Sequence, residues 1–508
     1  MDFQVTPFDD TAAYQIVASH DARFDGRLFV GVTSTGIYCR PICRVRTPLR
    51  RNCRFFATPA KAEAAGFRPC LRCRPEIAPG PAPAWTVMDA SRTLARQAAQ
   101  ALEEQAGSEG HDGGNPTRLA RVAERMGISE RHLRRIFYTE HGVTPLRYLQ
   151  TRRLLLAKQL LTDTRLPITQ VASASGFNSL RRFNAAFTDN YRMSPRRLRA
   201  GVDTGTQAVD AGSAEAAPTV KLAYRTPYDI DALLRFIARR AIPEVEQVEG
   251  RQVRRSLRAG IVAPVDGWVE VEFVAHAPLV RLRYAPALLN ASSRVIAAVR
   301  RWLDLDAAPE AIDNALTALP GAPGLRLPGS LDPFELAVRA VLGQQVSVTA
   351  ARTLACRVVE RFGTPIATPW SGISRSFPRP SVLAEAAPEL IAEMGVIRSR
   401  AGAIVALAQA WPQIAPLLAA PGPPEPLIER LCVIPGIGPW TAHYIAMRAL
   451  GWPDAFPPGD VAVLKAMKRL FDSRSRRDAE AIAQTWRPWR AYAVLRLWNS
   501  LSPAQTTG

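Results

Sequence analysis

The chain has 508 residues, of which 47% are hydrophobic, so it is long enough for about three or four domains with cores of their own. Its formal net charge is +20 and its pI about 10.4, and a protein this basic is expected to bind a polyanion, most simply nucleic acid. We find no run of 18 apolar residues and no basic-then-apolar leader, which argues against a membrane protein and predicts a cytoplasmic location.

Four of the seven cysteines form two pairs near the N-terminus: Cys39 and Cys43 are spaced C-x3-C, and Cys70 and Cys73 are spaced C-x2-C. In a reducing compartment this spacing predicts four thiolates around one tetrahedral zinc ion rather than disulfides. A purely structural zinc site is the simplest interpretation. A zinc-bound thiolate can also attack carbon without a separate base. Cys53 has no partner at ligand spacing and is interpreted as a core residue.

Arginines flank the first pair in the segment GIYCRPICRVR (36–46), and the second pair lies in AGFRPCLRC (65–73). Both segments resemble the N-terminal domain of the Ada-type adaptive-response proteins, over roughly residues 5–78. The resemblance implies that Cys39 is a sacrificial nucleophile that takes a methyl group from a methylphosphotriester in the DNA backbone. The Pro-Cys-His-Arg motif of the second Ada methyltransferase is absent from the sequence, so repair of 6-O-methylguanine is not expected.

The segment 116–200 carries 17 Lys and Arg against 5 Asp and Glu, a net charge of +12. Within it, the similar stretches 119–142 and 168–195 each predict a helix, a turn and a second helix. Gly127 and Gly176 are expected to form the turns. Two such pairs in a strongly basic segment predict a double helix-turn-helix, with each second helix in the major groove of DNA.

A long helix over 144–162 is expected to join the two motifs, and Ser129 and either Asn178 or Ser179 are expected to cap the second helices. The segment ends in YRMSPRRLR and resembles the AraC-type DNA-binding domain. A regulator of this type implies RNA polymerase as a further partner. The candidate DNA contacts are polar residues of the two second helices: His132, Arg134, Arg135, Arg181, Arg182 and Asn184.

Residues 201–218 are rich in Gly, Ala, Ser and Thr and predict a flexible linker, and 107–116 predicts a loop. Alternating apolar residues over 245–285 then predict an antiparallel sheet, with a helix over 230–241 on one face. From residue 292 onward, apolar residues at helical spacing predominate.

The stretch 431–470 predicts two helices joined by a tight hairpin, then a loop and a further helix. Gly436 and Gly438 allow the backbone to turn sharply and to approach another chain closely. The N–H groups that open the following helix suit a DNA phosphate. The segment PPG (457–459) places Asp460 beside apolar residues, where a carboxylate can stabilise a developing cation or simply cap a helix.

The hairpin and the aspartate at this spacing resemble the helix-hairpin-helix, Gly/Pro-Asp superfamily of base-excision DNA glycosylases, most closely the AlkA-type 3-methyladenine glycosylases. The match covers about residues 220–502 and includes PYDIDALLRFIARRA (227–241), DPFELAVRAVLGQQVSV (332–348) and WRPWRAYAVLRLW (486–498). It implies a small TBP-like α+β domain followed by an all-helical domain.

The resemblance also implies roles for single residues. Asp460 matches the catalytic aspartate, and Trp440, Tyr444 and Trp498 match aromatic residues that line a pocket for an electron-poor alkylated base. Trp440 stands where bifunctional relatives carry a Schiff-base lysine, so lyase activity is not expected. Gln345 matches the residue that fills the vacated base stack, which is leucine in the best-known member. The family also holds a monovalent cation at the hairpin carbonyls.

Together these patterns predict a multidomain, mainly α protein with α+β parts that binds double-stranded DNA and one zinc ion. The predicted function is hydrolytic excision of alkylated bases, combined with a methyl-responsive transcriptional activator. The alternatives are a transcription regulator whose last domain is only a DNA clamp, and an enzyme whose middle domain only adds DNA affinity. The predicted domains are a zinc-containing α/β methyl-acceptor head (1–79), an AraC-type double helix-turn-helix domain (85–200), a flexible linker (201–218), an α+β domain (219–325) and an all-α helix-hairpin-helix glycosylase domain (326–502).

Overall fold

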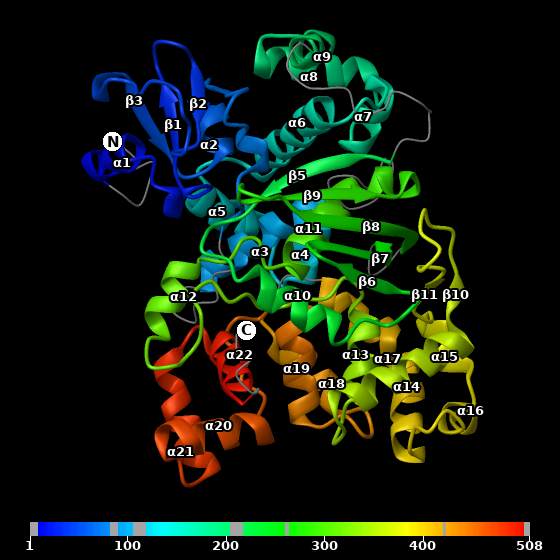
Figure 1. Ribbon diagram of the computed structural model, residues 1–508. Helices are drawn as coiled ribbons and strands as arrows, with labels where there is room; N and C mark the ends of the chain where they lie inside the picture. The colour runs from blue at the N-terminus through cyan, green and yellow to red at the C-terminus, as the bar shows by residue number, and fades with distance from the viewer. Residues whose placement is uncertain are drawn as a thin grey trace. The chain divides into compact units, whose positions relative to one another are not determined.

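The computed structural model describes residues 9–81, 90–104, 118–203, 217–259, 264–419 and 423–501 (Figure 1). The chain divides into two compact units, one made of Met1–Thr226 and Val271–Ala297 and the other of Pro227–Glu270 and Ala298–Gly508. The predicted loop at 107–116 and the part of the predicted linker at 204–216 lie outside the described residues.

The first unit begins with a zinc head, the name we use for residues 9–81, built on a small sheet of strand order β3-β1-β2-β4. Strand β1 (Phe29–Val32) is antiparallel to β2 (Ile37–Cys39) and to β3 (Cys53–Phe56), whereas β2 is parallel to β4 (Arg68–Pro69). The helices of the head are α1 (Asp10–Ala18), α2 (Pro59–Ala64) and three short 3-10 helices, Ala22–Phe24, Arg50–Asn52 and Pro75–Ile77.

Successive strand residues point to opposite faces of this sheet, and apolar residues occupy both faces. Phe29 lies opposite Phe56 and enters one cluster of buried side chains, whereas Val30 lies opposite Phe55 and enters the other. The cysteines belong to the second cluster. The sheet therefore has a core on each side, and the cysteine centre is built into one of them.

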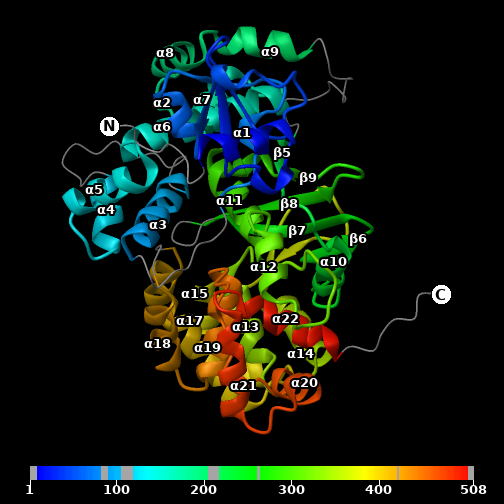
Figure 2. The same ribbon diagram turned by 90° about the vertical axis from the view of Figure 1, so that its left-hand side faces the viewer.

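The described residues between 90 and 203 form helices and their connections. In Figure 2, helices α3, α4 and α5 form one group, in agreement with the extensive contacts among them. Helix α6 is the long helix that was predicted between the two motifs. The bounds are α3 (Ala90–Glu104), α4 (Arg118–Arg125), α5 (Glu130–His141), α6 (Pro145–Asp163), α7 (Ile168–Ala174), α8 (Leu180–Tyr191) and α9 (Pro195–Asp203).

The predicted caps and turns of the two motifs are confirmed. Ser129 and Ser179 each accept a hydrogen bond from the backbone N–H three residues further on, so Ser179 and not Asn178 caps the second motif. Gly127 and Gly176 have φ angles of +66° and +80°, a region that glycine enters without steric cost. Local sequence thus determines where the second helix of each motif, α5 or α8, begins.

A five-stranded sheet follows, in the order β5-β9-β8-β7-β6, with β5–β9 and β6–β7 antiparallel. Helix α10 (Ile230–Ala238) contacts β6. It ends at Ala238, three residues before the predicted end, with Arg239 as its C-cap. The boundary between the two units falls inside β8. The strands are β5 (Thr219–Ala223), β6 (Glu246–Glu249), β7 (Gln252–Ala259), β8 (Val265–Phe273) and β9 (Leu279–Tyr284).

The second unit is mainly helical, as predicted, and Figure 2 shows α15, α17, α18 and α19 packed side by side. Two short strands, β10 (Thr364–Pro365) and β11 (Arg375–Ser376), pair antiparallel. The helices from the sheet to the C-terminus are the 3-10 helix Pro286–Ala291, α11 (Ser292–Trp302), α12 (Pro309–Ala315), α13 (Pro333–Leu342), α14 (Val348–Phe362), α15 (Pro380–Glu385), α16 (Pro388–Ala392), α17 (Arg398–Ala419), α18 (Glu425–Cys432), α19 (Pro439–Ala449), α20 (Val461–Phe471), α21 (Arg476–Ala483), the 3-10 helix Gln484–Trp486 and α22 (Arg490–Ser500).

Helix α17 is long and apolar enough to cross a bilayer by length and composition, and 56% of its apolar stretch is buried inside the protein. It contacts α13, α15, α16 and α18 of the same unit. Core helices of soluble proteins pass the same test, so α17 is weak evidence for a membrane span.

Candidate functional site

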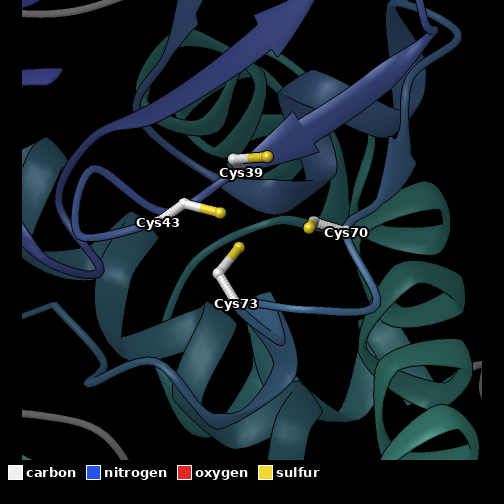
Figure 3. Close-up of side chains that lie close together, drawn as sticks. All are labelled: Cys39, Cys43, Cys70 and Cys73. Carbon is white, nitrogen blue, oxygen red and sulfur yellow. The ribbon is translucent and has the colours of Figure 1, made fainter. Parts of the chain in front are cut away.

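The parallel pairing of β2 with β4 explains how the two cysteine pairs meet. Cys39 ends β2 and Cys70 follows β4 directly, so the two residues leave neighbouring strands side by side. Cys43 and Cys73 lie on the segments that continue from them. The four sulfur atoms lie within 4.8 Å of one another, and Figure 3 shows them pointing toward a common centre.

This arrangement fits a zinc ion. Four sulfurs at a Zn–S distance of about 2.3 Å are expected to lie about 3.8 Å apart, which agrees with the observed cluster. Cys39, Cys43 and Cys70 are 5–7% exposed. The backbone N–H of Arg40 donates to Sγ of Cys73 at 3.3 Å, a bond that favours the thiolate form. The donors are therefore preorganised for a soft, tetrahedral divalent metal.

The arginines around the first cysteine pair have two different roles. Arg40 is 5% exposed, and its guanidinium donates to the carboxylate of Asp25 and, at 3.1 Å, to the carbonyl of Cys73. It holds the head together and does not face solvent. Arg44 and Arg46 are exposed, so these two are the arginines of the segment that a DNA phosphate can reach.

The second helices of the two motifs, α5 and α8, present the predicted polar residues to solvent. Helix α5 buries Leu133 and Phe137, and α8 buries Phe183 and Phe187, all at 0% exposure. On the opposite faces, Arg134 forms an ion pair with Glu130 one turn earlier, and Arg135 hydrogen-bonds the ring of His132 at 3.0 Å. Five of the six predicted DNA contacts are exposed and His132 is half-buried: Arg134, Arg135, Arg181, Arg182, Asn184 and His132.

The two glycines of the hairpin between α18 and α19 have different surroundings. Gly436 has a φ of +85°, and a Cβ there would come within 2.7 Å of Cβ of Ala403, so the fold itself requires glycine. Gly438 is the N-cap of α19, and a Cβ there would meet none of the described atoms within 4 Å. The second glycine therefore leaves an open surface at the start of a helix, where backbone N–H groups face outward.

Asp460 both caps a helix and receives two indole N–H groups. Its Oδ1 accepts from the backbone N–H of Val463 at 2.8 Å and from Nε1 of Trp498 at 3.2 Å, and its Oδ2 accepts from Nε1 of Trp440 at 2.8 Å. The residue is 7% exposed. Three N–H donors fix the orientation of this carboxylate. The N-cap interpretation and the functional one are therefore compatible.

Three aromatic residues lie together beside this carboxylate. The rings of Trp440 and Tyr444 are stacked, with centroids 5.4 Å apart and planes 8° apart, and Trp498 lies 6.3 Å from Tyr444. Burial raises the pKa of Tyr444, but the guanidinium groups of Arg448 and Arg240 outweigh it, so the pKa lies below its ordinary value. The second unit thus places an anion, three aromatic rings and nearby cations around one point.

Gln345 lies on the turn between α13 and α14. It is exposed and has a φ of +53°, a conformation that costs a non-glycine residue free energy. The neighbouring Gln344 donates its amide to the carbonyl of Gly436 at 2.9 Å and to Oγ1 of Thr441 at 3.0 Å. The turn is thus tied to the hairpin, a link that the sequence did not predict. The monovalent cation at the hairpin stays a prediction.

Comparison with known proteins assigns four segments to families. The matching models are the metal binding domain of Ada (residues 12–76), a helix-turn-helix domain (122–201), the AlkA N-terminal domain (219–332) and the HhH-GPD superfamily of base excision DNA repair proteins (338–491). Together with the four-cysteine cluster, these matches confirm the predicted fold class and the predicted zinc site.

Among similar proteins, the probable bifunctional transcriptional activator/DNA repair enzyme AlkA of Mycobacterium tuberculosis is 37% identical over 97% of each chain. DNA-3-methyladenine glycosylase 2 of Escherichia coli is 35% identical over 54% of this chain and 95% of its own. The bifunctional transcriptional activator/DNA repair enzyme Ada of Escherichia coli is 30% identical over 39% of this chain and 51% of its own. Since the first similarity extends over nearly the whole of both chains, the chain belongs to the family of bifunctional transcriptional activator/DNA repair enzymes of the AlkA type.

Proposed function

We propose that the second unit is a monofunctional DNA glycosylase that hydrolyses the N-glycosidic bond of alkylated bases, 3-methyladenine foremost. The observation that supports this most strongly is Asp460, a buried carboxylate held by two indole N–H groups in the segment that matches the HhH-GPD superfamily. The name of the Escherichia coli relative, a DNA-3-methyladenine glycosylase, agrees with this activity.

Excision first requires that the base leave the duplex, which costs a few kcal/mol. The hairpin at Gly436–Gly438 offers backbone N–H groups to a phosphate and offsets part of this cost. In this proposal Gln345 fills the space that the base vacates. Its exposed position on a turn tied to the hairpin supports the role.

Many alkylated bases are cationic and are already good leaving groups, so little acid assistance is needed. Positive charge then develops on the sugar as the N-glycosidic bond stretches. Asp460 stabilises that charge or orients the attacking water, while Trp440, Tyr444 and Trp498 stack against the electron-poor base. Trp440 occupies the position of the lysine nucleophile of bifunctional relatives, so the product is an intact abasic strand.

For the zinc head, we propose single-turnover methyl transfer from a DNA methylphosphotriester to Cys39. Zinc, when bound by the four cysteines, keeps their sulfurs as thiolates at neutral pH. The Cys39 sulfur attacks the methyl carbon, an S–C bond forms, the C–O bond breaks, and the phosphodiester oxygen leaves with the electron pair. The centre loses one negative charge, so its repulsion of DNA phosphates falls and DNA affinity rises.

The helix-turn-helix segment then binds a promoter, and the methylated protein activates transcription there. Contact with RNA polymerase is implied by this regulatory role and stays a prediction. The exposed polar residues of α5 and α8 support promoter binding. Which of them contact bases and which contact phosphates determines the specificity.

One assay tests these proposals together. Purified full-length protein is incubated with duplex DNA carrying labelled methyl groups on bases and on phosphates. We expect free 3-methyladenine in solution and one methyl group on each protein molecule. DNA binding without base release would favour the alternative of a regulator with an inactive DNA clamp.

A further inference from the structure

Arg448 connects the base pocket to the loop at 328–329. It lies one helical turn after Tyr444 on α19, and its Nη1 donates to the Tyr444 hydroxyl oxygen at 2.9 Å. Its Nε and Nη2 donate to the carbonyls of Pro328 and Gly329 at 2.8 and 3.0 Å. One guanidinium is therefore bound in three directions, and a planar group held in this way has little freedom to move.

The contacts of Arg448 lead directly to the carboxylate. Tyr444 is stacked on Trp440 with ring planes only 8° apart, and Trp440 donates its indole N–H to Asp460 at 2.8 Å. On the other side, the guanidinium of Arg448 lies 4.8 Å from the ring centroid of Phe236. Displacement of Arg448 would release the tyrosine ring and, through the stack, the indole that orients the carboxylate.

The hydroxyl of Tyr444 has a defined polarity because Arg448 is a donor only. Its oxygen accepts from Arg448, so its proton is left to donate elsewhere. Among the described residues, we find no acceptor within hydrogen-bond distance of that proton. A base in the pocket brings ring nitrogens or carbonyl oxygens that can accept it.

We propose that Arg448 is a positioning residue for base excision, which fixes the Tyr444 ring against Trp440 and directs the Tyr444 hydroxyl proton toward the base. The proposal rests on the proposed glycosylase function. A purely structural role for Arg448, in which it only closes the 328–329 loop, is the competing explanation. In the positioning role, the loss of rate on removing Arg448 depends on the Tyr444 hydroxyl. In the purely structural role, it does not.

A double-mutant cycle on the full-length protein separates them. The variants Arg448→Met, Tyr444→Phe and the double variant are compared in single-turnover release of 3-methyladenine. Loss of a charge-assisted hydrogen bond corresponds to roughly a tenfold or larger loss of rate. We expect each single variant to lose about this much and the double variant to be no worse than Arg448→Met.

Arg357→Met is the matched control. Arg357 also donates to a main-chain carbonyl, that of Met394 at 2.8 Å, and lies on α14. We expect this variant to retain the wild-type rate. Melting temperature and DNA affinity are measured for every variant, so that a general loss of structure is recognised.

Independent effects that multiply in the double variant would overturn the proposal and leave Arg448 a structural residue. If Arg448→Met does not fold, Tyr444→Phe decides alone, since full activity without the hydroxyl contradicts the proposed role. Failure of the proposed function is distinguishable, because the wild-type protein itself would then release no base.

Discussion

Lys158 of helix α6 and Glu76 of the zinc head form an ion pair in which Nζ lies 2.5 Å from Oε2, and neither side chain is more than 1% exposed. Arg74, which directly follows Cys73, binds both Glu76 and Asp163, the last residue of α6. Burial raises the pKa of Glu76, but Lys158 and Arg74 outweigh it and the pKa is lowered. This network joins the cysteine centre to the helix between the two helix-turn-helix motifs.

The substitution Lys158→Met removes the cation and keeps most of the side-chain volume. Removal of one partner of a buried ion pair costs about 3–5 kcal/mol, because a charge is left without compensation. Because Arg74 still faces Glu76, we expect the free energy of unfolding to fall by about 3 kcal/mol, the lower end of this range. Urea unfolding followed by circular dichroism measures it as a shift of the first unit's transition to lower urea.

The control for this experiment is Arg134→Met, in the same unit. Arg134 pairs with Glu130 on the surface of α5, with side chains 57% and 30% exposed, and such pairs contribute about 0–1 kcal/mol. Equal losses of stability in the two variants would show that the buried pair does not hold the head against α6 in the way described.

Glu63 makes the stability of the first unit depend on pH. It is 4% exposed, and burial raises its pKa from 4.5 to about 7, although Thr151 and Tyr38 donate hydrogen bonds to it. Between these values the folded protein keeps the proton and the unfolded chain releases it. The contribution of Glu63 to the free energy of unfolding is therefore complete below pH 4.5, and it is lost as the pH rises through about 7.

The variant Glu63→Gln cannot ionise and serves as the reference. Between about pH 4.5 and about pH 8, we expect the wild type to lose roughly 2–3 kcal/mol more stability than the variant. Thermal unfolding at a series of pH values measures the difference. Parallel pH profiles for the two proteins would contradict the assignment of a raised pKa to Glu63.

Cys39→Ser is expected to abolish methyl transfer from DNA phosphotriesters and to weaken zinc binding, because it removes both a thiolate nucleophile and a ligand. Cys53→Ser should do neither. Cys53 is 7% exposed, and its thiol donates to the carbonyl of Leu49 at 3.4 Å, away from the cluster. Labelled methyl transfer and zinc content are measured on both variants. Label on the Cys39→Ser protein would show that another residue accepts the methyl group.

Methylated protein is expected to bind one promoter sequence more tightly than unmethylated protein, with an affinity that falls steeply with salt. Arg181→Ala or Arg182→Ala should cost about 1–3 kcal/mol if the side chain contacts a base edge. Fluorescence anisotropy on labelled duplexes at several salt concentrations measures both effects. Identical binding curves before and after methylation would contradict the proposal that methylation of the zinc head raises DNA affinity.

Short-range patterns were predictable from the sequence. The two cysteine pairs, the glycine turns and the serine caps depend on residues a few positions apart. Arg40 shows the limit of such reasoning. It lies beside Cys39 in the sequence, but its partner Asp25 lies 15 residues away, and the ion pair buries it.

The links between distant segments were not predictable. Arg448 is visibly one helical turn after Tyr444, but its carbonyl acceptors at Pro328 and Gly329 lie about 120 residues earlier. The indole bonds to Asp460 likewise depend on how separate helices pack. No local propensity encodes such contacts, because they form only once the helices have assembled.

Asp460→Asn is the substitution that tests the catalytic assignment. It removes the negative charge, and its amide group places a donor against one of the three N–H groups that now point at the carboxylate. By analogy with removal of a single electrostatic stabiliser, base release should fall by ~100-fold or more. DNA binding and methyl transfer to the zinc head should be retained.

The most direct measurement of the central claim is therefore single-turnover release of 3-methyladenine by the wild type and by Asp460→Asn, with borohydride present in a parallel reaction. We predict rapid release by the wild type, a loss of ~100-fold or more in the variant, an intact abasic strand and no trapped covalent complex. Full base release by Asp460→Asn would contradict the catalytic role of this carboxylate, and a trapped adduct would contradict a monofunctional glycosylase.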